Sequence, residues 1–136
     1  MELNGETLRF IREHCKDDVR SLALQAPKYP GVDMPVALTQ IAGRQAAAEK
    51  IPSWHEEEGV LYPRHLSLEQ CSSEATARYK ASIIPESSSG TLTDLTGGFG
   101  IDCAFLSPKF HHVTYVERQE VLCEIASHNF PLLGLN

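Results

Sequence analysis

The feature that most constrains the fold of this sequence is a glycine-rich segment that follows a short apolar run. Residues 92–102 read LTDLTGGFGID. The segment holds three closely spaced glycines, Gly97, Gly98 and Gly100. Because glycine lacks a Cβ atom, the backbone can turn sharply there and a ligand can approach it closely. The pattern predicts a strand over residues 91–95, a tight turn, and a helix over residues 100–108.

A second alternation of strand and helix follows the first. The sequence predicts a strand over residues 112–117 and a helix over residues 118–129. Strands that alternate with helices form parallel β-α-β units with a right-handed crossover. In such a sheet, ligands bind at the carboxyl ends of the strands. We therefore expect Asp94 and Glu117, each near the end of a predicted strand, to face one crevice.

The sequence before this unit reads as helix and loop. Apolar residues at three-to-four spacing predict helices over residues 4–15, 17–25, 34–49 and 67–82. In the last of these, Ser67 and Gln70 form a capping-box pattern. Tyr79 is expected in its buried stripe, and Ser72, Ser73 and Glu74 are expected to face solvent.

The predicted fold class is α plus partial α/β. A helical domain over residues 1–85 is followed, over residues 86–136, by the first β-α-β-α of a Rossmann-like sheet. Residues 52–66 show no sustained period and predict an irregular connection, anchored by Trp54.

Composition excludes several classes of protein. The hydrophobic content is 42% and the charged content 22%, as in ordinary globular proteins. No apolar run suits a membrane span or a signal peptide, so we expect a cytoplasmic protein without a membrane partner. The four cysteines form no CxxC pair and no zinc pattern, which predicts free thiols and no metal site.

The net charge of −6 gives no overall basic field that would attract nucleic acid. Basic residues recur near helical spacing at Arg9, Arg12, Lys16 and Arg20. Because acidic residues are interleaved with them, they predict a solvated helix face, with an RNA contact as the alternative.

Two classes of cofactor use a glycine turn with an acidic partner. The dinucleotide fingerprint GxGxxG requires a glycine where Cys103 stands, so Gly98-Phe99-Gly100 is only a partial match. An acceptor at Asp94 suits a cationic ligand, such as the amino-acid part of S-adenosylmethionine (SAM), better than a pyrophosphate.

These residues resemble the class I SAM-dependent methyltransferases. Residues 94–102 are similar to their first motif, in the variant found in RNA guanine-N2 methyltransferases, and Val116-Glu117 is similar to the second. The stretch from His128-Asn129 to Leu133-Gly134 resembles the "HN…LG" of those RNA enzymes. Further segments resemble a region that precedes the first motif in the bacterial THUMP-like methyltransferase family, namely residues 66–74 and Tyr79-Lys80-Ala81. The likeness covers about residues 60–136.

The resemblance implies SAM as cofactor and RNA (rRNA or tRNA) as the substrate of the intact enzyme. The cofactor-binding residues that it implies are Asp94, Thr96, Gly97, Gly98, Gly100, Asp102 and Glu117. Thr96 departs from the family, because many members carry a glycine there. Asp102 has an equal alternative role, the stabilisation of the first helical turn. The adenine-contacting segment and the catalytic motif have no counterpart, so no catalytic residue is assigned.

Two strands cannot bury both faces of a parallel sheet, and both flanking strands of the family sheet are missing here. We therefore expect an N-terminal fragment of a longer enzyme, itself inactive and with weak or unmeasurable affinity for SAM. Unpaired strand edges are expected to promote self-association. Two alternatives remain: a fragment that binds an NAD-type dinucleotide, and a helical interaction module over residues 1–85 without catalysis.

Overall fold

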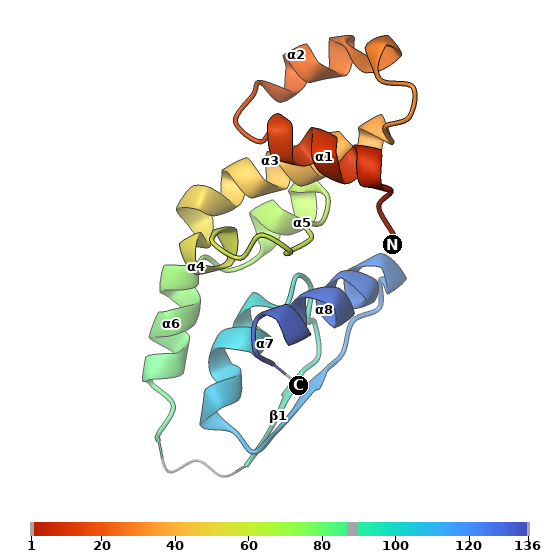
Figure 1. Cartoon of the computed structure of the whole chain (residues 1–136). Coiled ribbons are helices and arrows are strands. Elements are labelled where there is room, and N and C mark those ends of the chain that lie inside the picture. The colour runs from red at the N-terminus through yellow and green to blue at the C-terminus, as the bar shows by residue number, and fades with distance from the viewer. Residues whose placement is uncertain (1, 87–89, 136) are drawn as a thin grey trace.

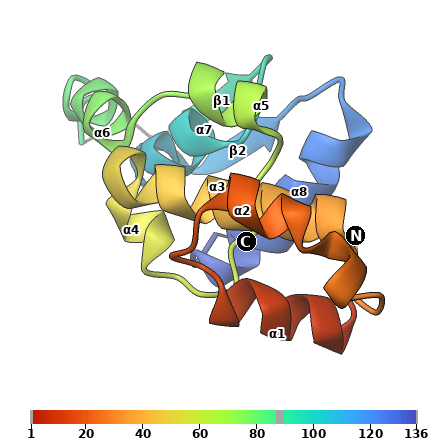
Figure 2. The same cartoon turned by 90° about the horizontal axis from the view of Figure 1, so that it is seen from above.

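The computed structural model of this chain describes residues 2–86 and 90–135. The helical part contains α1 (Gly5–Glu13), α2 (Val19–Leu24), a short 3-10 turn (Ala26–Lys28), α3 (Met34–Lys50), α4 (Pro52–His55), α5 (His65–Gln70) and α6 (Glu74–Ser82). The second part contains β1 (Thr91–Asp94), α7 (Ile101–Leu106), a second 3-10 turn (Ser107–Lys109), β2 (His112–Tyr115) and α8 (Glu120–Leu132). In Figures 1 and 2, α3 lies across the molecule between α1 and the sheet-bearing part.

The predicted β-α-β unit is confirmed. β1 and β2 are parallel neighbours, in register from Thr91 opposite His112 to Asp94 opposite Tyr115. α7 forms the crossover and α8 follows β2, so the described chain is mostly helical with a two-stranded parallel sheet. This architecture agrees with a partial α/β fold.

Short polar side chains fix where several helices begin. Asn4 accepts a hydrogen bond from the Thr7 backbone N–H at 2.8 Å, and Asp18 accepts one from Ser21 at 3.2 Å. These are the N-cap contacts that satisfy free N–H groups in a first helical turn. Asp18 is the N-cap of α2, and these hydrogen bonds from Ser21 lower the pKa of its carboxyl group.

The prediction of one helix over residues 67–82 is wrong. The structure has α5 and α6 there, separated by residues 71–73. Ser73, rather than Ser67, is the N-cap, because its side chain accepts from the Thr76 backbone N–H at 3.1 Å. A serine that bonds its own backbone in this way favours a helix start over a helix interior.

Because of this break, α6 buries a different face from the one that the sequence predicted. Tyr79, expected in the core, is 68% exposed, whereas Ala77 is fully buried. Ser72, Ser73 and Glu74 do not face solvent as expected, because all three are half-buried and bonded within the protein. The connection at residues 52–66 is not wholly irregular, since it contains α4, but Trp54 anchors it as predicted.

One hydrophobic cluster joins the helical part to the sheet-bearing part. The Trp54 ring lies edge-on to the Phe99 ring of the glycine segment, with the centroids 5.0 Å apart. The same cluster contains Leu68 and Ala77 on one side and Ile101 and Ile125 on the other. Because this cluster contains residues from both sides of residue 85, the domain boundary predicted there stays a prediction. A second cluster, around Phe10, Leu22 and Ile41, holds α1, α2 and α3 together.

All four cysteines are free thiols. Among the residues that the structure describes, no helix is both long and apolar enough to cross a membrane, and no group of three or more His, Cys, Asp or Glu residues could hold a metal ion.

Candidate functional site

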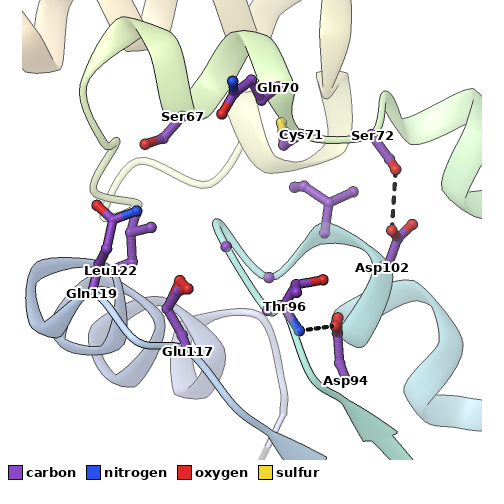
Figure 3. A pocket seen from close by; sticks show the side chains of 14 residues that line it. Ser67, Gln70, Cys71, Ser72, Asp94, Thr96, Asp102, Glu117, Gln119 and Leu122 are labelled. Atoms are coloured by element: carbon purple, nitrogen blue, oxygen red, sulfur yellow. Dashed lines mark hydrogen bonds between the residues drawn. The ribbon is translucent and has the colours of Figure 1, made fainter.

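A cavity of about 350 Å³ opens where the carboxyl ends of β1 and β2 meet α5. The predicted cofactor-binding residues all line it: Asp94, Thr96, Gly97, Gly98, Gly100, Asp102 and Glu117. Figure 3 shows Thr96 and Glu117 on the sheet side and Ser67 and Gln70 on the opposite side. The structure thus brings together in one place the residues that the sequence pattern singled out.

The glycine turn is shaped by close packing as well as by backbone conformation. Gly98 and Gly100 have positive φ values of 54° and 92°, which side-chain-bearing residues rarely adopt. A Cβ atom at Gly97 would overlap the Tyr115 ring, and one at Gly100 would lie 2.7 Å from the Phe130 ring. The Tyr115 hydroxyl also donates to the Gly98 carbonyl at 2.5 Å. Only glycine at these positions lets the turn lie flat against β2 and α8.

Two acceptors flank this turn at the strand ends. Asp94 ends β1, and its carboxylate accepts from the Thr96 backbone N–H at 3.2 Å. Glu117 follows β2 and is half-buried, on the cavity wall. A wall that combines carboxylates, hydroxyls and an open glycine backbone fits a ligand that carries hydroxyl and ammonium groups.

The opposite wall comes from the helical part, which sequence reasoning did not include in the site. Residues at the end of α5 and just beyond it line the cavity, namely Ser67, Gln70, Cys71 and Ser72. Lys50 of α3 fixes this wall, because its ammonium donates to the Leu68 and Glu69 carbonyls at 2.7 Å each. The resemblance over residues 66–74 is the sequence signal for this wall, but the single helix predicted there places Ser67 and Gln70 in a capping box and Ser72 in solvent rather than in a site.

The sheet-bearing part adds three further lining residues that were not predicted: Ile101, Gln119 and Leu122. Ile101 begins α7, and the other two lie at the start of α8. Local sequence patterns do not predict that these residues line the cavity, because their positions depend on how α7 and α8 are oriented against the glycine turn.

The electrostatics of the cavity are dominated by carboxylates. Asp94, Asp102 and Glu117 all line it. Asp102 pairs with the Lys80 ammonium at 3.1 Å, and it is the one lining carboxylate with an ion-pair partner in the part of the chain that the structure describes. Behind the turn, burial and then the charge of Asp94 raise the pKa of Cys103 to about 11, so this thiol stays protonated near neutral pH.

No protein-family model matches the chain, and no curated protein sequence matches it. A solved structure does. The chain is similar to a protein of Porphyromonas gingivalis W83 described as a "putative methyltransferase", with a TM-score of 0.75 and 32% sequence identity. The match covers 96% of this chain and 32% of that protein, so the chain spans about a third of its length. The likeness supports a methyltransferase-like partial α/β fold.

Proposed function

We propose that this chain forms part of the SAM-binding site of a methyltransferase. The observation that carries the proposal is the single cavity in which Asp94, the glycine turn and Glu117 converge at the carboxyl ends of two parallel strands. The likeness to the Porphyromonas gingivalis protein supports the same class. The runner-up, an NAD-type dinucleotide, fits less well, because Cys103 replaces a fingerprint glycine and is itself buried.

Each part of the wall has a distinct task in this proposal. Glu117 accepts from the ribose hydroxyls, and Asp94 accepts from the ammonium group of the amino-acid end. The glycine turn lets the backbone approach the ligand without side chains between them. SAM supplies a methyl group on a positively charged sulfur. The contribution of the protein is to bind and orient the cofactor, and positioning of this kind provides much of the acceleration in a transfer between two bound reactants.

Weak binding is expected from this chain. The adenine-contacting segment and the catalytic motif of the resembling family have no counterpart among these residues, so part of the contact surface is missing. We propose that SAM binds weakly, in the millimolar range, and that the chain alone does not catalyse methyl transfer.

Titration of the ¹⁵N-labelled chain with SAM, 5′-methylthioadenosine and NADH tests this assignment. SAM should shift the amide signals of the glycine turn. Glu117→Ala should weaken both SAM and 5′-methylthioadenosine, because both carry the ribose, whereas Asp94→Asn should weaken SAM alone. Glu120→Gln, at an exposed position outside the cavity, is the matched control. Tighter binding of NADH than of SAM at the same amides would favour the dinucleotide alternative and overturn the proposal.

We further propose RNA as the methyl acceptor. The support is the resemblance of residues 94–102 and of the His128-Asn129 stretch to RNA guanine-N2 methyltransferases. Incubation of the longest product of the gene with methyl-labelled SAM and total cellular RNA, protein or DNA tests it. Label is expected in RNA. Label in protein or DNA instead would overturn the RNA assignment while leaving the SAM site in place.

A further inference from the structure

Three polar side chains from three separate segments meet at one end of the cavity. The Lys80 ammonium lies 3.1 Å from the Ser72 hydroxyl oxygen, and 3.2 and 3.1 Å from the two carboxylate oxygens of Asp102. The Ser72 hydroxyl donates to the same carboxylate at 3.1 Å. Ser72 and Asp102 line the cavity, and Figure 3 shows the bond between them at its edge. Lys80 is not among the residues that line the cavity.

The break between α5 and α6 places these groups. Ser72 lies in the break, Lys80 on α6, and Asp102 in the first turn of α7. α6 packs against α7 through buried Ala77 and Ala104, and the Arg78 guanidinium lies 5.0 Å from the centre of the Phe105 ring. The cluster therefore lies beside a well-packed contact between α6 and α7, and this contact does not require Lys80.

If this cluster served only to link α6 to α7, Ser72 and Asp102 would not need to line the cavity. The amino-acid end of SAM carries a carboxylate as well as an ammonium group. Beside an unpaired Asp102 that ligand carboxylate would be repelled, because like charges at close range disfavour one another. Lys80 neutralises Asp102 at the place where repulsion would act. Ser72 adds a hydroxyl that can donate to an anion while it accepts from Lys80.

We propose that Ser72 binds the α-carboxylate of the amino-acid end of the cofactor, and that Lys80 and Asp102 are positioning residues for it. The proposal rests on the assignment of the cavity to SAM. In the complex the Ser72 hydroxyl turns from Asp102 to the ligand carboxylate, and Lys80 holds the serine oxygen and supplies the opposite charge. Asp94 remains the acceptor for the ammonium group. The helical part of the chain thereby contributes the carboxylate end of the site.

Binding of three ligands by the whole chain tests the assignment: SAM, decarboxylated SAM and 5′-methylthioadenosine. Ser72→Ala and Lys80→Met should each weaken SAM about fivefold, as expected for a charge-assisted hydrogen bond that is partly exposed. Neither variant should weaken the binding of the other two ligands by more than about twofold, because both lack the carboxylate. Lys80→Arg should recover part of the loss for SAM. Arg78→Met, which disturbs the same helix contact away from the cavity, is the matched control.

The outcomes separate the two proposals. An equal loss for all three ligands in Lys80→Met would make the cluster a structural tie and overturn the inference. Unchanged SAM binding in both variants would also overturn it, while the SAM site stood. If the unmodified chain bound none of the three ligands, the proposed function itself would fail.

Discussion

Asn129 of α8 holds Leu61 by the two hydrogen bonds that a neighbouring β-strand would make. The Leu61 N–H donates to the Asn129 side-chain oxygen at 2.8 Å, and the Asn129 amide donates to the Leu61 carbonyl at 2.8 Å. Gln40 of α3 does the same for Tyr62, at 2.8 and 2.9 Å. Next to Asn129, the His128 ring lies 2.9 Å from the Gly59 carbonyl. Two amide side chains thus satisfy a buried, extended segment between α3 and α8, as buried backbone groups require.

The first prediction concerns this pair. Asn129 is fully buried, so Asn129→Ala leaves both backbone groups of Leu61 without partners. Each such group costs roughly 1–3 kcal/mol, and we expect a loss of about 2–4 kcal/mol in the free energy of unfolding, measured with urea. Asn129→Asp should be as damaging, because its second oxygen would face the Leu61 carbonyl. Ser127→Ala, at an exposed position on the same helix, should change stability by less than about 0.5 kcal/mol. A loss below 1 kcal/mol in Asn129→Ala would contradict this role.

The second prediction concerns the glycine turn. Gly97→Ala would drive a methyl group into the Tyr115 ring, and Gly100→Ala would combine a positive φ with contact on Phe130. Each should cost about 1–3 kcal/mol, as overpacking and backbone strain typically do. Gly90→Ala meets nothing within 4 Å and is the control, with an expected change within about 0.5 kcal/mol. Thermal unfolding of the three variants decides the matter, and equal melting temperatures for all three would refute the packing argument.

The third prediction concerns the Tyr62 hydroxyl, a buried side-chain polar atom without a hydrogen-bond partner among the described residues. Tyr62→Phe removes this unsatisfied group and should stabilise the protein by about 1 kcal/mol. Burial, opposed by the Arg44 charge, raises the pKa of Tyr62 to about 12 from an ordinary 10.0.

The same shift predicts a dependence on pH. The folded pKa lies above the unfolded one, so ionisation of the Tyr62 phenol favours the unfolded state. The free energy of unfolding is therefore unaffected by this ionisation below pH 10 and decreases as pH rises toward 12. The advantage of Tyr62→Phe should therefore grow over that range in urea unfolding. Tyr79→Phe, at an exposed position, is the control and should change stability by less than about 0.5 kcal/mol at pH 7. A destabilised Tyr62→Phe would mean that the hydroxyl has a partner after all.

The fourth prediction concerns Glu74, which links α6 to the start of α4. One carboxylate oxygen accepts from the Ser53 backbone N–H at 2.9 Å and from its hydroxyl at 2.6 Å, and the other accepts from Arg78 at 3.0 Å. Burial acts to raise the pKa of Glu74, but the hydrogen bonds from Ser53 and the Arg78 charge outweigh it, so the pKa lies below the ordinary 4.5.

A lowered pKa stabilises the fold above the unfolded value and ceases to do so as pH falls through the folded value. Glu74→Gln should therefore cost about 1–2 kcal/mol at pH 7, and the difference from the unmodified chain should shrink below pH 4. Glu69→Gln, on an exposed side chain, is the comparison. If the cost of Glu74→Gln were the same at pH 3 and pH 7, the charge of this carboxylate would play no part.

The fifth prediction concerns the sheet edges. β1 and β2 pair only with each other in the described sheet, and Leu95, just beyond β1, is 74% exposed. Unpaired edges next to exposed apolar residues favour pairing with another copy. We expect the average mass in analytical ultracentrifugation to rise with concentration, and Leu95→Lys to reduce that rise. Leu24→Lys, on α2 and 85% exposed, should not. A monodisperse monomer at all concentrations would contradict self-association.

The sequence by itself determined the order of strands and helices from residue 91 onward, and most of the residues on the sheet side of the cavity. Glycines that need positive φ values, and acidic residues at strand ends, are local requirements, so Gly98, Gly100, Asp94 and Glu117 could be read directly. Only the tertiary structure decided how the helical part meets this edge. Whether residues 71–73 continue a helix or break it depends on Ser73 capping α6 and on the packing of α6 against α7. The Ser73 cap is local, but the packing of α6 against α7 joins segments distant in the sequence, and it brings Ser72 to Asp102 while Tyr79 faces solvent.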